Sequence, residues 1–323
     1  MFNLDDEVLK SVLNRLHQDD LNKALEGMHH ETLLKAVKGS GLVYVQRQVS
    51  RKGKTFQQGM WVKASEADKH QRAGGEMKQT HEMHKDTGDK YNSGRAALHQ
   101  KIVNKIVAEC GKPEKGQKPV AILMGGGSAS GKSTMRSKVI EKDLAESGIK
   151  AGTIDSDEIK NEIPEFASLK KTHPEDAARL VHEESSDIGS HALDSVIDQG
   201  RHFIYDGTMK NKKKYSDLVD RLKKAGYEVH AYVADVPLEE AIKRSDARAE
   251  RSGRKVPHDI IESSHTGVPG TIEHIKDRLD SHRVYDNTDK LHLISSDAGV
   301  HDEEKYGKFL DKGKIKHNLG KKK

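Results

Sequence analysis

Residues 120–134 of the chain read Val120-Ala-Ile-Leu-Met-Gly-Gly-Gly-Ser-Ala-Ser-Gly-Lys-Ser-Thr134. An apolar run, which predicts a buried strand, leads directly into a glycine-rich loop, and a helical stretch follows the loop. From Gly126 to Ser133 the residues fit the pattern G-x-x-x-x-G-K-S, in the strand, loop and helix context that this pattern requires. The stretch therefore predicts a phosphate-binding loop (P-loop) within an α/β fold.

The residue types of this loop predict its chemistry. Glycines let backbone N–H groups fold around a phosphate, and the following helix directs the positive end of its dipole at the same anion. Lys132 can reach the β- and γ-phosphates of a nucleotide, and the Ser133 hydroxyl can ligate Mg²⁺. We therefore expect ATP or GTP with Mg²⁺, and disfavour a glycine-rich turn without nucleotide. The expected nucleotide-binding residues are Gly126, Gly127, Ser128, Ala129, Ser130, Gly131, Lys132, Ser133 and Thr134.

Outward from the loop, short apolar runs alternate with helical stretches. Strands that alternate with helices of ten or more residues predict a parallel sheet with helices on both faces, the arrangement of P-loop kinases. We expect this α/β domain to span residues 95–296. Its expected strands are 120–124, 152–154, 202–205, 228–233 and 290–294, and its expected helices are 95–107, 132–147, 176–199, 214–225 and 238–250.

Three flanking segments differ in composition from this domain. Residues 1–63 combine helical apolar spacing with two alternating runs around Arg51-Lys52-Gly53-Lys54, which predict a small α+β region with a β-hairpin. Residues 64–94 are rich in charge, Gly and His and nearly lack aliphatic side chains, so we expect a polar linker. Residues 297–323 are expected to form a polar tail that is basic at its end.

Composition narrows the class of protein. With 33% charged residues and no apolar run approaching the ~20 residues of a membrane helix, a membrane-spanning protein is excluded. The chain begins with acidic residues and lacks a signal-peptide pattern, so we expect a cytoplasmic protein. Cys110 is the single cysteine and cannot form an internal disulfide. His70, His81 and His84 fit a solvated linker better than a metal site, because neither Cys nor a carboxylate framework accompanies them.

Acidic residues follow two of the expected strands at their carboxyl ends, where open α/β sheets bind ligands. These are Asp155-Ser156-Asp157 and Asp206-Gly207-Thr208. In small-molecule kinases an acid at the first position can take the proton of the acceptor hydroxyl or hold Mg²⁺. Asp155 or Ser156 can also cap the next helix, and both roles can hold. Glu184, on the helix before the Asp206 strand, is a further acceptor-site candidate, with an exposed helix acid as the equal alternative.

Arginines recur in the last turns of the expected helix at 238–250 and directly after it. A cluster of this kind suits a lid that closes over a transferring phosphate, and a solvated basic helix end is the alternative. The residues are Arg244, Arg248, Arg251 and Arg254.

Taken together, these stretches resemble the zeta toxin family of P-loop kinases over about residues 95–296. The best-studied members of that family phosphorylate the sugar 3′-hydroxyl of UDP-N-acetylglucosamine with ATP. The resemblance rests on RAALHQKIV (95–103), GGGSASGKST (125–134), IDSDEIKNEIPEF (154–166), HEESSDIG (182–189), HFIYDGT (202–208), GYEVHAYVADVPLEEAIKR (226–244) and ARAERSGRKVP (247–257).

The resemblance implies roles for individual residues. Lys132 would contact the transferring phosphate, and Asp157 would be the base on the sugar hydroxyl. Arg248 and Arg254 would stabilise the γ-phosphate.

The same resemblance implies that Asp206 and Thr208 line the acceptor site. Two departures bear on that site, because toxin-type members carry Glu where Asp206 stands and Arg near the position of Lys210. We therefore expect a reshaped acceptor pocket.

An ATP-dependent kinase that phosphorylates a nucleotide sugar is the leading prediction. The alternatives are a polynucleotide 5′-kinase and a non-catalytic, ATP-gated interaction module of a phage or mobile element. The net charge of +5 and the basic tail give the polynucleotide kinase some support. Aromatic residues for base stacking are only 4% of the chain, which disfavours a nucleic-acid partner. The presence of Asp157, Arg248 and Arg254 disfavours the non-catalytic module. We expect regulation by an antitoxin or by an autoinhibitory N-terminal region, and no membrane partner.

Overall fold

The computed structural model describes residues 42–51, 54–63, 78–86, 90–174, 176–252, 256 and 258–314, with the side chains of 42–63 and 250–252 left aside. The chain divides into two compact units, Met1–Val103 with Ser156–Ser190, and Asn104–Asp155 with His191–Lys323. The single α/β domain expected over 95–296 is therefore divided. The segment Ser156–Ser190 is helical throughout its regular elements and groups with the N-terminal part of the chain.

The second unit is built on a seven-stranded sheet with the order β4-β5-β3-β6-β7-β8-β9. From β4 to β7 neighbouring strands pair in parallel, whereas β8 and β9 pair antiparallel. The predicted α/β fold with a mostly parallel sheet is thereby confirmed. The strands are β3 (Val120–Gly125), β4 (Gly152–Asp155), β5 (Phe203–Asp206), β6 (Glu228–Asp235), β7 (Ser281–Asp286), β8 (His292–Ser296) and β9 (Gly299–Val300).

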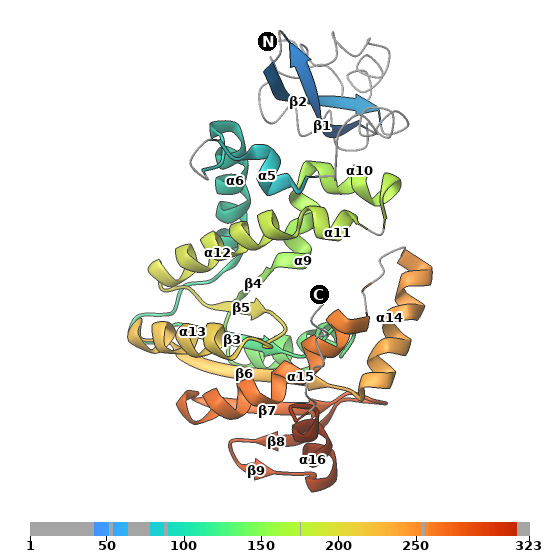
Figure 1. The fold of residues 1–323 in the computed structure, drawn as a ribbon. Helices are drawn as coiled ribbons and strands as arrows, with labels where there is room; N and C mark the ends of the chain where they lie inside the picture. Colours follow the sequence, from blue (N-terminus) through green and yellow to red (C-terminus); the bar gives the residue numbers. More distant parts are fainter. Residues whose placement is uncertain are drawn as a thin grey trace. The chain divides into compact units, whose positions relative to one another are not determined.

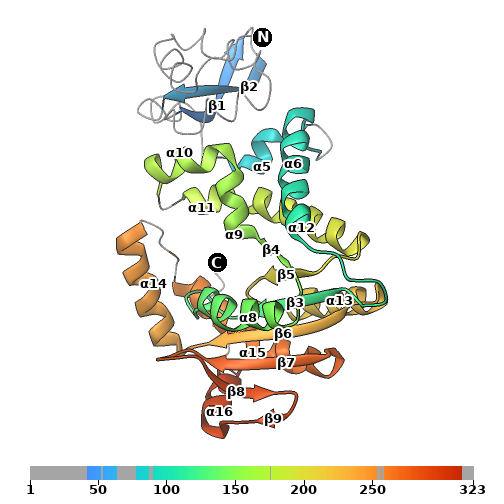
Figure 2. The ribbon, with the colours of Figure 1, turned by 180° about the vertical axis from the view of Figure 1, so that it is seen from behind.

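Helices cover both faces of this sheet. Figure 1 views the face that α13 and α15 cover, and Figure 2, turned by 180°, views the face that α8 covers. The helix after the P-loop runs from α7 through a π-helical stretch, Arg136–Ile140, into α8. The helices of this unit include α7 (Lys132–Met135), α8 (Glu141–Glu146), α13 (Lys212–Lys224), α14 (Leu238–Ser252), α15 (His258–Ile275) and α16 (Glu303–Lys312). None of the helices within the described ranges is long and apolar enough to cross a membrane.

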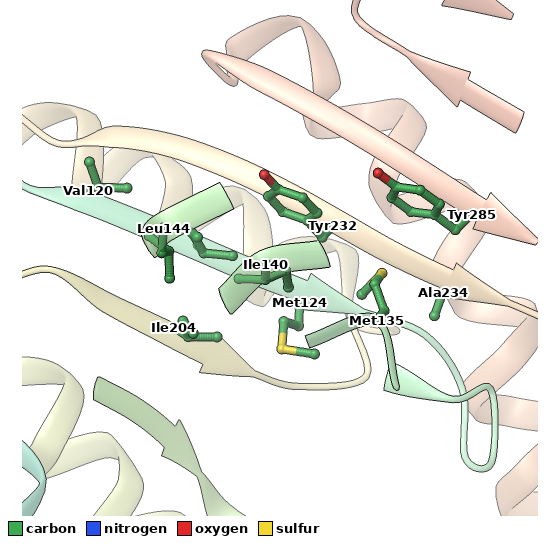
Figure 3. Packing of buried hydrophobic residues seen from close by; sticks show 10 residues of the cluster. Val120, Met124, Met135, Ile140, Leu144, Ile204, Tyr232, Ala234 and Tyr285 are labelled. Atoms are coloured by element: carbon green, nitrogen blue, oxygen red, sulfur yellow. The ribbon is translucent and has the colours of Figure 1, made fainter. Parts of the chain in front are cut away.

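The P-loop helix is fixed to the sheet by an apolar cluster (Figure 3). Met135, Ile140 and Leu144 lie on the helix side of this cluster, and all three are buried. They pack against side chains of β3 and its neighbours, among them Met124 and Ile204. Because both the strand before the loop and the helix after it are buried in one core, the two ends of the P-loop are held in place.

Strand β7 and helix α15 of this unit were missed by the sequence analysis. Strand β7 contains a single aliphatic residue, Val284, so its pattern does not resemble a buried strand, although His282 and Asp286 are also buried there. Helix α15 contains Gly267, Pro269 and Gly270, residues that weaken a helix prediction. The last expected strand, 290–294, is present as β8 but runs antiparallel, because the short connection after β7 permits only a hairpin.

The first unit contains a hairpin and short helices. Strands β1 (Leu42–Arg51) and β2 (Lys54–Lys63) pair antiparallel from Leu42↔Lys63 to Arg51↔Lys54, as the alternating pattern predicts. The helix expected in the first 40 residues lies outside the described residues. The unit also holds α5 (Thr80–His84), α9 (Ser156–Ile159), α10 (Pro164–Thr172), α11 (Ala177–Leu180) and parts of α6 (Ser93–Glu109) and α12 (His182–Asp198).

The linker expected over 64–94 is wrong for its described part. Thr80 of α5 is fully buried, Lys85 pairs with Tyr91 in an isolated β-bridge, and His84 contacts Glu165. The described residues 78–86 and 90–94 contain no aliphatic side chain, and polar side chains with buried partners hold them in place.

The polar tail expected over 297–323 is also wrong in part, because residues Glu303–Lys312 form α16. The side chain of Asp302 caps this helix by accepting a hydrogen bond from the Lys305 N–H, and Tyr306 and Phe309 are buried. Two aromatic residues one turn apart are enough to dock a helix whose remaining residues are mostly charged.

We therefore expect Phe309→Ala to lower the free energy of unfolding by roughly 3 kcal/mol, since Phe309 is 1% exposed and its removal leaves a cavity. Chemical denaturation of the full chain measures the change. Val300→Ala is the control, because Val300 is 41% exposed and its loss should shift stability by less than about 0.5 kcal/mol. Equal stability of the two variants would show that α16 is not part of the folded unit.

Candidate functional site

The P-loop joins β3 to α7 through a backbone path that requires glycine. Gly126 has a φ of 137° and Gly131 a φ of 87°, both in the left-handed region that side chains rarely adopt. Ala129 also has a positive φ, of 62°, which a residue with a Cβ adopts at some cost. The loop therefore holds a strained conformation that its surroundings must stabilise.

Neighbouring groups approach the loop so closely that no Cβ fits at three of its positions. A Cβ on Gly126 would overlap the Ala234 carbonyl oxygen, one on Gly127 the His265 ring, and one on Gly131 the Asn287 amide. The spacing of the motif is thus a packing requirement as well as a conformational one.

Three side chains far away in the sequence hold the loop backbone. The Ser264 hydroxyl accepts a hydrogen bond from the Ser128 N–H at 2.9 Å, and His265 Nε2 donates to the Ser128 carbonyl at 2.9 Å. Asn287 Nδ2 donates to the Ser130 carbonyl at 3.0 Å. The sequence analysis missed all three, and no local signal could have found them, because they follow the motif by more than 100 residues and belong to no pattern.

The interior of the loop is suited to a ligand. Burial, together with the charges of Lys312 and Lys132, lowers the pKa of His265 to about 4, so the ring is neutral near pH 7 and donates through Nε2. Its Nδ1 and the Ser130 hydroxyl are buried and have no hydrogen-bond partner within the described part of the chain. The Ser130 hydroxyl can donate a hydrogen bond to a phosphate oxygen at this glycine-rich loop, whereas Nδ1 of the neutral His265 ring can only accept one.

Charged groups gather beside the loop. Lys132 Nζ donates to the Gly126 carbonyl at 3.2 Å and lies 4.0 Å from an Asp206 oxygen, and Arg136 lies 3.9 Å from the other Asp206 oxygen. Asp206 ends β5, directly beside β3. The Thr208 carbonyl accepts a hydrogen bond from the Gly126 N–H at 3.1 Å. The structure thus brings together three predicted residues, Lys132, Asp206 and Thr208, and adds Arg136.

Asp157 lies in the first unit, on α9, and its side chain is half-exposed. Its carboxylate accepts a hydrogen bond from Lys160 Nζ at 2.7 Å, and Lys160 is only 4% exposed. Along the chain Asp157 follows Asp155, the last residue of β4, whose register partner is Asp206. A nearly buried ammonium therefore holds this carboxylate in one orientation.

The arginine cluster separates into different environments. Arg244 of α14 donates to the carbonyls of Asn287 and Thr288, at 3.1 and 2.5 Å, and so braces the segment that supports the P-loop. Arg248 is exposed on the same helix. Arg254 lies outside the described residues, as does the side chain of Arg251.

Glu184 belongs to a buried ion cluster in the first unit. It pairs with Arg95 and with His99, the latter at 2.7 Å, while Arg95 also binds both oxygens of Glu165, at 3.1 and 2.8 Å. His84 completes the cluster with a 2.7 Å contact to Glu165. Since Glu184 is fully buried, the exposed helix acid that we weighed as an alternative is wrong, and contact with an acceptor stays a prediction.

The cluster keeps its carboxylates ionised. Burial alone would raise the pKa of Glu165, but Arg95 and His84 outweigh burial and lower it to about 2. The same competition between burial and Arg95 lowers the pKa of Glu184. No group of three or more His, Cys, Asp or Glu residues within the described ranges could hold a metal ion.

The sequence profile of the family described as Zeta toxin matches residues 104–298, more than half of the chain. The chain belongs to the zeta toxin family. Toxin zeta of Streptococcus pyogenes is 28% identical over 155 residues, which are 45% of this chain and 53% of that protein. The chain thus spans about half the length of the curated toxins that it matches. A calmodulin calcium-dependent NAD kinase of Arabidopsis thaliana is 35% identical over 96 residues, 28% of this chain and 18% of that protein.

Solved structures support the zeta toxin fold. The AvrRxo1-ORF1:-ORF2 complex with ATP superposes with a TM-score of 0.58 at 18% identity, covering 73% of this chain and 82% of that one. A structure of the PezAT toxin-antitoxin system of Streptococcus pneumoniae gives 0.50 at 18% identity, covering 63% and 81%. At these identities the likeness establishes the fold.

In this zeta toxin family member, Glu184→Gln should lower the free energy of unfolding by roughly 3 kcal/mol near pH 7, because it removes a buried partner of Arg95. Because the pKa of Glu184 is depressed, its stabilisation is complete above the unfolded value of ~4.3 and disappears as the pH falls further. The difference from wild type should shrink accordingly in acid. Denaturation at several pH values measures it.

Glu183→Gln provides the matched control, since Glu183 is the exposed neighbour on the same helix. Its stability should equal that of wild type within about 0.5 kcal/mol. If Glu184→Gln were equally harmless, the cluster would not stabilise the first unit.

Proposed function

We propose that this protein is an ATP-dependent kinase that transfers the γ-phosphate of ATP to a hydroxyl of a nucleotide sugar such as UDP-N-acetylglucosamine. The observation that carries the proposal is the P-loop backbone at Gly126–Gly131, where no Cβ fits on Gly126, Gly127 or Gly131, with Lys132 beside it. The Lys132 ammonium lies 4.0 Å from a carboxylate oxygen of Asp206, at the end of the neighbouring strand. A P-loop lysine next to an acid at a strand end is the arrangement that P-loop phosphotransferases use for a nucleotide and its metal ion.

The donor side follows from residues of the second unit. Backbone N–H groups of the loop and the Lys132 ammonium would bind the phosphates, and the unpartnered Ser130 hydroxyl would donate to one of their oxygens. Ser133 and Asp206 would hold Mg²⁺, which neutralises charge on the β- and γ-phosphates. Arg248 and Arg254 would stabilise the charge that spreads over the transferring group.

The acceptor side relies on Asp157. Its carboxylate would take the proton of the acceptor hydroxyl as that oxygen attacks the γ-phosphorus and ADP leaves. Lys160 supports this role, because its ammonium fixes the orientation of the carboxylate and offsets its charge. Glu184, Asp206 and Thr208 remain proposed acceptor-site residues.

The identity of the acceptor molecule is the most specific part of the proposal. Family resemblance supports a nucleotide sugar, whereas Asp206 and Lys210 differ from the residues of toxin-type members. The NAD kinase relative, at 35% identity over 96 residues, makes NAD a second candidate. Both acceptors offer a ribose or sugar hydroxyl next to a pyrophosphate, so the same base and metal ion would serve either.

A regulatory partner belongs to the same proposal. Two structural neighbours come from the AvrRxo1-ORF1:-ORF2 complex and from the PezAT toxin-antitoxin system. We infer that an antitoxin, or the N-terminal region of this chain, controls the site in an analogous way.

The deciding experiment incubates the full chain with γ-labelled ATP and Mg²⁺ and with one acceptor at a time. The panel contains UDP-N-acetylglucosamine, other nucleotide sugars, NAD and a 5′-hydroxyl oligonucleotide. A labelled nucleotide sugar supports the proposal, labelled NAD supports the second candidate, and a labelled oligonucleotide contradicts both. ATP binding without any transfer would favour the non-catalytic module.

ATP with Mg²⁺ should raise the melting temperature of the wild-type chain, because a ligand that binds the folded state stabilises it by mass action. Lys132→Ala should remove most of that increase, whereas Lys142→Ala, an exposed lysine on α8, should keep it. Thermal denaturation with and without ATP measures both. An unchanged melting temperature of wild type at millimolar ATP contradicts nucleotide binding.

Asp157→Asn should reduce turnover by ~10²–10⁴ while leaving ATP affinity within a few-fold, because only the proton acceptor is lost. Glu158→Gln is the matched control, since Glu158 is the adjacent exposed acid of α9. Single-turnover transfer and ATP titration separate the two quantities. Turnover of Asp157→Asn within tenfold of wild type would mean that this acid orders α9 and is not the base.

A further inference from the structure

Two buried aspartates lie side by side at the edge of the sheet that carries the P-loop. Asp235 ends β6 and Asp286 ends β7, and the two are register partners in the parallel pair. Both are largely buried, at 7% and 8% exposure. Carboxylates at this edge would repel the phosphates of a nucleotide unless cations offset them.

The offsetting cations come from α16, which lies beyond the matched residues 104–298. Lys312 Nζ binds both carboxylate oxygens of Asp235 and the Val236 carbonyl, the last at 2.8 Å. Lys305 Nζ donates to Asp286 at 2.9 Å. The Lys312 side chain is nearly as buried as that of its partner, so this pair is not a solvated surface contact.

A short chain of contacts joins the Lys312 pair to the P-loop. The Asn287 N–H donates to the Asp235 carbonyl at 2.7 Å, and Asn287 Nδ2 donates to the Ser130 carbonyl. Ala234, which precedes Asp235, is the residue whose carbonyl oxygen a Cβ on Gly126 would overlap. The ammonium groups of Lys312 and Lys132 act on the same His265 ring.

We propose that Lys312 is a positioning residue of the nucleotide site, which neutralises Asp235 beside the P-loop and so allows a triphosphate to bind there. The inference rests on the proposed nucleotide binding but not on the identity of the acceptor. It makes α16 a component of the site, although α16 contributes no residue to the P-loop motif.

The proposal entails a dependence on pH. Burial raises the pKa of Asp235 to about 6, and Lys312 opposes that rise. The charged groups near Asp235 are Lys312 on α16 and Asp286 on β7, with Lys305 paired to Asp286. His265, whose pKa Lys312 lowers, is neutral. In a protein without Lys312, the Asp235 side chain is a neutral carboxylic acid at low pH. At higher pH it ionises, and no cation then opposes its negative charge. ATP should therefore bind more weakly at higher pH.

The test measures ATP affinity of the full chain with Mg²⁺ by calorimetric titration at a series of pH values. Lys312→Met should weaken ATP binding on the order of tenfold at the most alkaline pH of the series, where Asp235 is ionised and leaves one uncompensated charge near a polyanion. Asp235→Asn combined with Lys312→Met should restore affinity to within about threefold of wild type. The dissociation constant of Lys312→Met divided by that of the double variant should grow as the pH rises. The reason is that both variants lack Lys312 and differ only in the ionisable group at position 235.

Lys308→Met is the matched control, since Lys308 is an exposed lysine of α16 paired with Glu304. Its ATP affinity should equal that of wild type. The proposal is overturned if Lys312→Met binds ATP like wild type, if the double variant stays as weak as Lys312→Met, or if the ratio does not change with pH.

If Lys312→Met does not fold, the single variant Asp235→Asn tests the proposal instead. With Lys312 unopposed, this variant should bind ATP at least as tightly as wild type at about pH 8, and weaker binding overturns the proposal. Wild-type protein that fails to bind ATP would contradict the proposed function itself, whereas normal wild-type binding isolates the role of Lys312.

Discussion

The close approach of side chains to the P-loop backbone is the constraint on which the rest of the second unit depends. His265 and Asn287 occupy the space that a Cβ on Gly127 or Gly131 would need, and their hydrogen bonds hold a loop with a left-handed non-glycine residue, Ala129. Helix α15 must therefore lie against the loop, and β7 must end where Asn287 can reach it. The order of the parallel strands allows both the position of α15 against the loop and the position of Asn287 at the end of β7.

The first unit is organised by a different interaction, the pairing of Arg95 with two buried glutamates. Burying one cation and two anions costs desolvation energy, and the cost is offset because every carboxylate also contacts a histidine. Removing any one partner leaves a charge without compensation. This dependence explains why a segment that is poor in aliphatic residues, 78–94, is nevertheless ordered where the structure describes it.

Charge compensation by lysine recurs at carboxylates of both units. Lys160 holds Asp157 in the first unit, and Lys312 and Lys305 offset the aspartates at the sheet edge in the second. In each case a carboxylate that an α/β fold places at a strand end or helix start is paired with a lysine from another turn or element. Zeta toxin family membership accounts for the P-loop and its acids, while α16 lies outside the matched region.

The sequence by itself determined the P-loop, the α/β class, four of the five parallel strands and the acids at the carboxyl ends of β4 and β5. These depend on local information, namely apolar runs, glycine spacing and residues directly adjacent to a strand. Only the tertiary structure decided that β7 belongs in the sheet, that Ser264, His265 and Asn287 support the loop, and that 303–312 docks as a helix. Those features arise from contacts between residues far apart in the chain, and a polar residue carries no local sign of the buried partner that will stabilise it.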